Sequence, residues 1–368
     1  MVILGLVRPE LTRRLVCPSC TTPLDLRAFD EEGGRVREGV LLCDGCSTWY
    51  PIVSAVPVLL DFRTAAHDRF VSDHGGELAG YTLPRGRPRP GEESVQQTFG
   101  EEWAAVVDSE LSFTYSEEDL ESLNRRVWLA FLGERPEVSR LLDIGCGLGA
   151  ETLALRKVTG ADEVVGIDLN LSLLAGGAPR EAPEGTHFAV ASIFALPFER
   201  ASFDLVYSQG VLHHTYSTEA AFSSVSAFVA ERGYLFVWVY GQEDRLGLDG
   251  RRAVVTRTLY VAEQGLRPAL ARAPEAVREA FFKVASRAAH PLLRPRVQHP
   301  ERWGRENTEH YLRDMLSPRF AWRHRWNEVL EWFERDDYEI VGVQSPNAYR
   351  ELFGDRLWGV GVAGRRRG

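Results

Sequence analysis

The feature that most constrains this chain is a strand, a glycine-rich turn and the start of a helix in the segment LLDIGCGLGA, Leu141–Ala150. The apolar strand contains an acid, Asp143, and the turn carries Gly145, Gly147 and Gly149. Glycine lets a backbone pass close to a ligand that a side chain would obstruct. The free N–H groups at the start of the helix favour an anionic or carboxylate-bearing ligand. Taken alone, the turn also has a purely structural explanation, because tight strand-to-helix turns often carry two glycines.

A second buried strand that ends in an acid follows this turn. The segment Glu163–Asn170 has the sequence EVVGIDLN, and Asp168 lies about 20 residues beyond the last glycine, a spacing typical of an acid on ribose hydroxyls. The two segments predict a nucleotide-type cofactor at the carboxyl edge of a parallel sheet. A dinucleotide-dependent oxidoreductase would share both of them.

Four ordered motifs distinguish the chain from such an oxidoreductase: LLDIGCGLGA, VVGIDLN, LPFERASFDLVYSQGVLHH and GYLFVWVYG. On these motifs the chain resembles the class I S-adenosylmethionine (SAM)-dependent methyltransferases. The segments Phe99–Trp103 and Asp314–Phe320 are similar to segments that flank the core in one bacterial subgroup, so the resemblance covers roughly residues 95–343. It implies an α/β fold with a Rossmann-like, seven-stranded, mostly parallel sheet and helices on both faces.

The resemblance also implies which residues hold SAM. The glycine-rich loop would hold the methionine part, Asp168 the ribose, and Leu169 would lie against the adenine. Family members usually carry an acid after the third strand that accepts a hydrogen bond from the adenine amino group, but this chain has Ser192 there. A serine oxygen accepts that bond without charge assistance, so weaker adenine recognition is expected. The cofactor-binding candidates are Asp143, Gly145, Cys146, Gly147, Gly149, Asp168, Leu169, Ser192, Ile193 and Gln209.

Two adjacent histidines, His213 and His214, follow the fourth strand at the lip where the transferred methyl group should sit. Methyl transfer needs an aligned nucleophile and a dry site, and it needs a base only when the nucleophile is a hydroxyl, an ammonium or a weakly acidic carbon. Imidazole suits that task. Because adjacent side chains on a turn cannot both face one way, one catalytic base is expected, with His214 favoured over His213. The alternative is that both histidines only orient the loop.

The five cysteines divide into two C-x-x-C pairs and one lone residue, Cys146, in the glycine-rich loop. The pairs, Cys17 with Cys20 and Cys43 with Cys46, predict one structural zinc site with four thiolate ligands. Two disulfides or a redox dithiol are the alternatives, which a reducing compartment and the missing helical context disfavour. The surrounding sequence resembles the small zinc-ribbon activators of tRNA and protein methyltransferases, here fused in cis, which implies a stabilising role.

The chain divides into four consecutive regions. Residues 1–62 are expected to form the zinc ribbon, 63–94 a linker or extended arm that need not pack tightly, 95–135 pre-core lid helices, and 136–368 the SAM-binding domain. A helical cap inserted at about 245–315 should stand above the carboxyl edge of the sheet. Substrate and lid candidates, for most of which core packing is the alternative, are Phe99, Trp103, Phe113, Tyr115, Tyr240, His310 and Tyr311.

Length, composition and net charge argue against some functional classes. With 368 residues, 44% of them hydrophobic, the chain can bury a full core, and its net charge of −9 argues against a large nucleic-acid footprint. No run reaches the roughly 20 apolar residues of a membrane span, and the first residues lack the order of a signal peptide, so a cytoplasmic location is expected.

These features predict a SAM-dependent methyltransferase with a small-molecule substrate, such as a secondary metabolite or a glycan or lipid-type precursor. One alternative is an enzyme of the same fold that uses SAM, or a sulfonium derived from it, for cyclisation. Another is an RNA or protein methyltransferase, or a noncatalytic SAM-binding subunit. No obligate partner or membrane association is expected, and homo-oligomerisation is left open.

Overall fold

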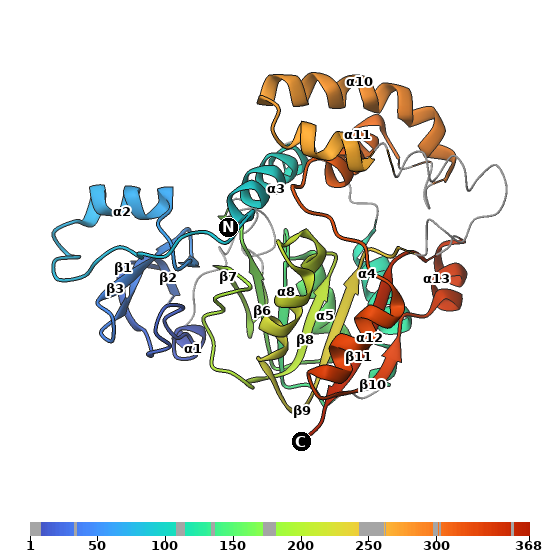
Figure 1. Ribbon diagram of the computed structural model, residues 1–368. Coiled ribbons are helices and arrows are strands. Elements are labelled where there is room, and N and C mark those ends of the chain that lie inside the picture. The colour runs from blue at the N-terminus through green and yellow to red at the C-terminus, as the bar shows by residue number, and fades with distance from the viewer. Residues whose placement is uncertain are drawn as a thin grey trace.

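The structure is a computed structural model in which one continuous sheet organises the molecule (Figure 1). The described residues are 9–32, 35–107, 115–133, 137–171, 182–242, 261, 263–296, 301, 303–354 and 357–368. Among them, eleven strands are hydrogen-bonded in the order β1-β2-β3-β4-β7-β6-β5-β8-β9-β11-β10.

Seven of these strands form the sheet that the sequence predicts. β5 to β9 run parallel, and β11 is inserted antiparallel between β9 and β10. The seven strands are β5 (Arg140–Ile144), β6 (Glu163–Asp168), β7 (Thr186–Ala191), β8 (Phe203–Gln209), β9 (Val229–Val239), β10 (Tyr338–Val343) and β11 (Val360–Arg366). The central strands are near-continuous apolar segments. This composition is required because helices cover both faces of the sheet, so the side chains on both faces are buried. The predicted fold class is confirmed.

Neighbouring strand residues pack into separate cores on the two faces of the sheet. Leu142 belongs to a core with residues of α8 and α12, whereas Leu141 belongs to a core with residues of α4, α5 and α13. The helices and helical turns beside these strands are α4 (Glu117–Leu123), η1 (Asn124–Trp128), η2 (Ala130–Leu132), α5 (Ala150–Thr159), η3 (Leu212–His214), α8 (Thr218–Ser226), α12 (Trp326–Arg335) and α13 (Pro346–Phe353).

The N-terminal residues extend the main sheet. After the short helix α1 (Pro9–Thr12), four strands form an antiparallel meander that joins β7 through β4. The joining pairs, both parallel, are Val58 with Val190 and Leu59 with Ala191. The four strands are β1 (Asp25–Glu32), β2 (Arg35–Cys43), β3 (Thr48–Val53) and β4 (Val56–Leu59).

Residues 63–94 pack more closely than a linker would. They contain the helix α2 (Ala65–His74), whose Phe70 is buried beside Trp49 of β3 at 6.2 Å between ring centroids. Thr82 also forms an isolated bridge with Thr48. This segment therefore packs against the N-terminal strands, because α2 covers an apolar face of them.

Helices stand over the carboxyl ends of the parallel strands (Figure 1). α3 (Glu92–Val107) lies nearest to the sheet, and α10 (Glu275–Leu293), η5 (Arg294–Arg296) and α11 (Arg305–Leu316) lie beyond it, with α11 in contact with α3. Residues 263–270 are also helical. Within the described ranges, no helix is long and apolar enough to cross a membrane.

Candidate functional site

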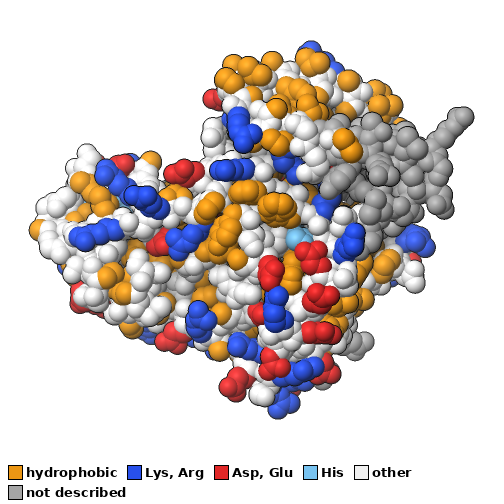
Figure 2. Space-filling model, viewed as in Figure 1, with side chains coloured by type: hydrophobic (Ala, Val, Ile, Leu, Met, Phe, Trp, Pro, Cys, Tyr) orange, Lys and Arg blue, Asp and Glu red, His pale blue; other side chains and the backbone are white. Residues whose placement is uncertain are grey.

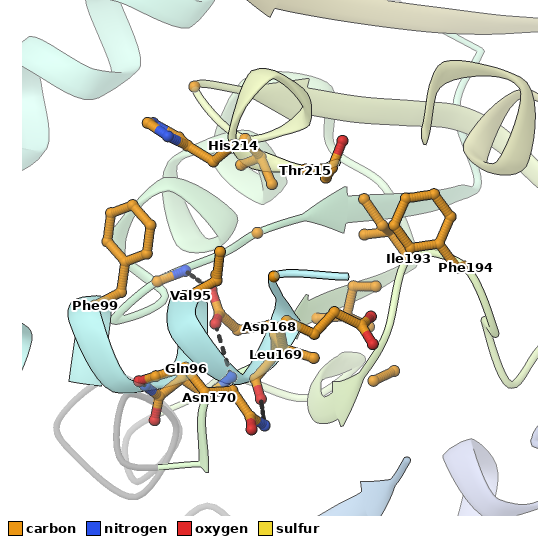
Figure 3. Close-up of a pocket in the computed structure, with 18 of the residues that line it drawn as sticks. Val95, Gln96, Phe99, Asp168, Leu169, Asn170, Ile193, Phe194, His214 and Thr215 are labelled. Atoms are coloured by element: carbon orange, nitrogen blue, oxygen red, sulfur yellow. Dashed lines mark hydrogen bonds between the residues drawn. The ribbon is translucent and has the colours of Figure 1, made fainter. Parts of the chain in front are cut away.

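A pocket opens at the carboxyl ends of the central strands, under α3 (Figure 3). In the sheet β5 lies between β6 and β8, so the strand order reverses at this position, where open α/β sheets bind ligands. Figure 2 shows hydrophobic side chains gathered in the middle of this face of the molecule, between the N-terminal strands and the helices α10 and α11. The loops after β5, β6, β7 and β8 form the floor and sides, with α3 and one residue of α11 as further walls.

The glycine-rich loop after β5 forms part of the pocket wall. Gly145 and Gly147 line the pocket with φ values of +75° and +51°. A Cβ atom on Gly145 would lie 2.2 Å from a methyl carbon of Val211, whereas one on Gly147 would meet no atom within 4 Å. The first position therefore needs glycine for packing and for its backbone conformation. The second leaves open space for a ligand.

Asp168 ties the end of β6 to this loop. Its Oδ2 accepts a hydrogen bond from the Gly147 N–H at 3.1 Å, and its Oδ1 accepts one from the Asn170 N–H at 3.0 Å. Burial raises the pKa of Asp168 to about 6, so the group is largely ionised at neutral pH. Each carboxylate oxygen keeps acceptor capacity for a further donor, and Asp168 lines the pocket beside Leu169.

Three of the predicted cofactor residues support the loop but do not line the pocket. Asp143 is buried and accepts a hydrogen bond from the Thr152 hydroxyl at 2.6 Å, and burial raises its pKa to about 8. Cys146 is buried in the apolar cluster that reaches the N-terminal strands. Gly149 is the residue that precedes α5.

The loops after β7 and β8 complete the sides of the pocket. Ile193 and Gln209, two of the predicted cofactor residues, line it together with Phe194 and Gly210. Ser192 is buried and does not line the pocket; its hydroxyl is turned toward the Glu92 carboxylate of α3.

Hydrogen bonds hold α3 over the pocket. The Gln96 side chain donates to the Leu169 carbonyl at 2.8 Å, and the Asn170 side chain donates to the Gln96 carbonyl at 2.6 Å. Phe99 lines the pocket with its ring edge-on to His214 at 5.3 Å between centroids. Of the other lid candidates, the Trp103 side chain and Phe113 lie outside the described residues.

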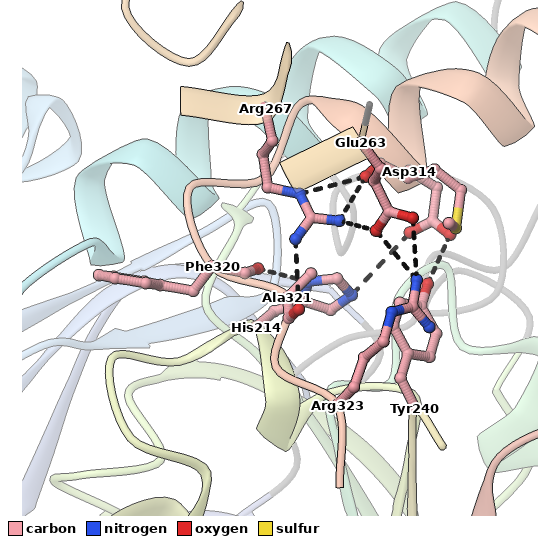
Figure 4. A network of polar contacts seen from close by, with 9 residues as sticks. His214, Tyr240, Glu263, Arg267, Asp314, Phe320, Ala321 and Arg323 are labelled. Carbon is pink, nitrogen blue, oxygen red and sulfur yellow. Dashed lines mark hydrogen bonds and ion pairs between the residues drawn. The ribbon is translucent and has the colours of Figure 1, made fainter. Parts of the chain in front are cut away.

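His214 reaches the pocket from the turn after β8 with a defined proton position. Its Nδ1 lies 2.9 Å from the Phe320 carbonyl oxygen, which can only accept, so Nδ1 carries the hydrogen and Nε2 has the lone pair in the neutral ring. Nε2 lies 4.0 Å from Oδ1 of Asp314, the pocket residue contributed by α11 (Figure 4). Burial lowers the pKa of His214, which keeps the ring neutral.

His213 does not line the pocket. Its ring packs on Tyr240 at 3.9 Å between centroids, and neither ring nitrogen has a hydrogen-bond partner among the described residues. Tyr240 does not line the pocket either, but its hydroxyl donates to Oδ2 of Asp314 at 2.9 Å. The two neighbouring histidines thus differ in the surroundings that they face, and only His214 can meet a ligand.

Three further candidates do not line the pocket. His310 and Tyr311 lie about one turn before Asp314 on α11, and the Tyr311 side chain is exposed beside Trp303. Tyr115 belongs to the core that contains α4 and α13, where its hydroxyl lies 3.1 Å from that of Tyr349. The substrate or lid role expected for these three side chains therefore stays a prediction, without support from the lining of this pocket.

The four N-terminal cysteines form one cluster. All four Sγ atoms lie within 4.8 Å of one another, and three of the distances between them are 3.3, 3.5 and 3.6 Å. A tetrahedral zinc ion with Zn–S bonds of about 2.3 Å separates its sulfur ligands by about 3.8 Å, so a small expansion of the cluster accommodates the ion. The donor set therefore fits structural zinc.

Comparison with protein families assigns both parts of the molecule. Residues 142–237 match the family described as a methyltransferase domain, and residues 8–53 match the family described as Trm112p-like protein. The chain combines a methyltransferase domain with a Trm112-like domain. Both resemblances inferred from the sequence motifs and cysteine pairs are confirmed.

Individual relatives match different shares of the chain. An uncharacterised protein of Synechococcus is 26% identical over 62% of this chain and 53% of its own length. A demethylmenaquinone methyltransferase of Roseiflexus castenholzii is 32% identical over 25% of this chain and 38% of its own length. The chain thus spans about half of the first relative and less of the second. A structure of the Haloferax volcanii Trm112 methyltransferase activator in complex with a methyltransferase aligns with 74% of this chain and 98% of that chain, at 14% identity and a TM-score of 0.44.

Several residues of the pocket in the methyltransferase domain were not anticipated from the sequence. Asn170 lies two residues after Asp168, and Asp314 is the first residue of the family-like DMLSPRF segment. Those positions were the signal available in the sequence. Glu92 lies in the expected linker, where nothing local marks it. The other unanticipated lining residues are Pro90, Gly91, Val95, Gln96, Ile167, Ala191, Phe194, Gly210, Val211, Thr215 and Tyr216.

Proposed function

We propose that this protein is a SAM-dependent methyltransferase with a small-molecule substrate. The observation that carries the proposal is a single pocket with the Asp168 carboxylate and the glycine-rich loop on one wall and His214 on another. The match of residues 142–237 to a methyltransferase domain supports the reaction class. The name of the Roseiflexus relative supports a small-molecule substrate.

The residues at the pocket fit SAM. Asp168 offers carboxylate oxygens to ribose hydroxyls, Gly147 and Gly210 leave the space that a Cβ would take, and Leu169 and Ile193 supply apolar walls. When bound, SAM supplies a methyl group on a positively charged sulfur. The tasks left to the protein are to orient the acceptor and to exclude water.

His214 is the proposed general base. The hydrogen bond to the Phe320 carbonyl leaves its Nε2 free to take a proton from a hydroxyl or ammonium group. Asp314, whose second oxygen is held by Tyr240, faces Nε2 and favours the imidazolium once it forms. Phe99 covers the ring from the side of α3. The position of the pocket under α3 and the negative net charge support a small acceptor over a nucleic acid.

The Trm112-like domain has a supporting role in this proposal. Cys17, Cys20, Cys43 and Cys46 would hold a structural zinc ion and leave no coordination position for substrate. The parallel pairing of β4 with β7 joins this domain to the methyltransferase sheet within one chain. This connection supports the proposal that no separate activator subunit is required.

Calorimetric titration of the full chain with SAM and with S-adenosylhomocysteine tests the cofactor assignment. Saturable binding is expected, and Asp168→Ala should weaken it at least about 10-fold because hydrogen bonds to a charged group are lost. Asp162→Ala is the matched control, since Asp162 is exposed and lies outside the pocket. Failure of the folded wild-type protein to bind either ligand would contradict the proposal. Mass analysis of products with candidate acceptors then separates methylation from cyclisation.

A further inference from the structure

Glu92 is a buried carboxylate at the pocket that takes no part in the proposed binding of ribose or in the proposed removal of a proton from the acceptor. It is the first residue of α3, lines the pocket, and has only 7% of its surface exposed. A buried acid lowers stability unless other groups compensate its charge, because that charge loses the hydration that it has in water. The partners of Glu92 therefore indicate what the group does.

The main partner of Glu92 is Ser192, which follows β7 a hundred residues later in the chain. The Ser192 hydroxyl donates to Oε1 of Glu92, and its oxygen accepts the Phe194 N–H at 3.1 Å. The single hydrogen of the serine is thus directed at the carboxylate, and the serine does not line the pocket. Glu92, and not Ser192, presents an oxygen acceptor at this end of the site.

The surroundings keep part of the carboxylate available to a ligand. The Arg89 N–H donates to Oε2, and the Arg89 guanidinium lies 3.4 Å from Asp61. Burial and the Asp61 charge raise the pKa of Glu92, and the Arg89 charge opposes them. A carboxylate has acceptor sites for about four hydrogens, so two donors leave capacity for a third.

The pocket beside Glu92 has the character of a site for a flat apolar ring with a polar edge. Leu169, Ile193 and Phe194 line it together with the carboxylate. A buried oxygen acceptor next to such walls selects a ring that carries an N–H donor, because a ring without the donor would leave the remaining acceptor site of the carboxylate desolvated and unfilled.

We propose that Glu92 supplies from α3 the carboxylate that the loop after β7 lacks, and that it accepts a hydrogen bond from the adenine amino group of SAM. The inference rests on the proposed function and deepens it. It replaces the expectation of weaker adenine recognition through Ser192. It also makes cofactor recognition depend on α3, a helix outside the sheet domain that Ser192, Leu169 and Asn170 hold in place.

Binding of S-adenosylhomocysteine and of its analogue without the adenine amino group tests this role by calorimetry. The wild-type protein should prefer the amino-bearing ligand, whereas Glu92→Ala should bind it about 10- to 100-fold more weakly and lose most of the preference. Glu93→Ala is the matched control, because Glu93 carries the same charge in the same helical turn but is exposed. The double variant Glu92→Ala/Ser192→Asp returns a carboxylate to the loop after β7 and should recover the preference.

The outcomes separate this inference from the function on which it rests. Wild-type binding with an unchanged affinity and preference in Glu92→Ala would overturn the role of Glu92 and leave the cofactor assignment standing. An equal loss in Glu93→Ala would assign the effect to the helix and would also overturn it. Absence of wild-type binding to both ligands would overturn the proposed function, and this inference with it.

Discussion

Removal of the zinc ion proposed for the cysteine cluster should unfold the N-terminal strands. Structural zinc in small domains contributes about 10–16 kcal/mol of apparent binding free energy at neutral pH. The hydrophobic core of a domain shorter than about 80 residues contributes only about 3–5 kcal/mol on its own. Two of the four sulfurs, on Cys17 and Cys43, belong to fully buried residues, so the cluster is part of the core of β1–β4. The apo domain is therefore expected to lose its cooperative fold.

The loss should reach the main sheet along the edge that the N-terminal residues cover, where β4 pairs with β7 and Leu15 bridges to Phe198. β4 joins β7 through two residue pairs, so an unfolded N-terminal domain turns β7 into an edge strand. Hydrogen exchange followed by mass spectrometry, after chelation or in a Cys43→Ser variant, should show fast exchange in β2 and β3 and partial deprotection of β7. β5 and β8, in the middle of the sheet, should keep their protection.

Cys146→Ser is the matched control for this experiment, because Cys146 lies in the glycine-rich loop outside the cluster. That variant should retain one zinc per chain by elemental analysis. The reasoning is refuted if Cys43→Ser also retains one zinc, or if the metal-free protein protects β2 and β3 as well as the zinc-loaded protein does.

Two further predictions concern the pocket. Gly147→Val should weaken SAM binding at least about 10-fold, because it strains a backbone at φ +51° and places a side chain in the open space of the site. Gly160→Val is the control, because Gly160 has a φ of +68° but follows α5 and does not line the pocket. The control should lower stability in thermal unfolding by a similar amount without changing SAM affinity. His214→Gln should lower the turnover rate about 10²- to 10⁴-fold with acceptors that need deprotonation. Since burial lowers the pKa of His214 below its ordinary 6.5, the wild-type rate should fall only as pH drops below that value, and persistence of this acidic limb in the variant would refute the role of His214.

Features that depend on local backbone requirements could be predicted from the sequence. The glycine-rich turn after β5, the acid at the end of β6 and the two cysteine pairs each place their chemistry within a few residues, so their spacing indicated a nucleotide-type cofactor site and a metal site. The fold class was implied by the resemblance of four motifs to the class I methyltransferases. The same local logic indicated that His213 and His214 face different surroundings.

Only the tertiary structure showed which distant residues meet. Glu92 contacts Ser192 across 100 residues, His214 meets the Phe320 carbonyl across 106, and β4 pairs with β7 although the whole of α3 and β5 lies between them in the chain. No periodicity or motif encodes such contacts, because they follow from how the sheet and its covering helices pack. The part of the pocket that lies outside the sheet domain was therefore decided by packing, and local sequence pattern carried no signal for it.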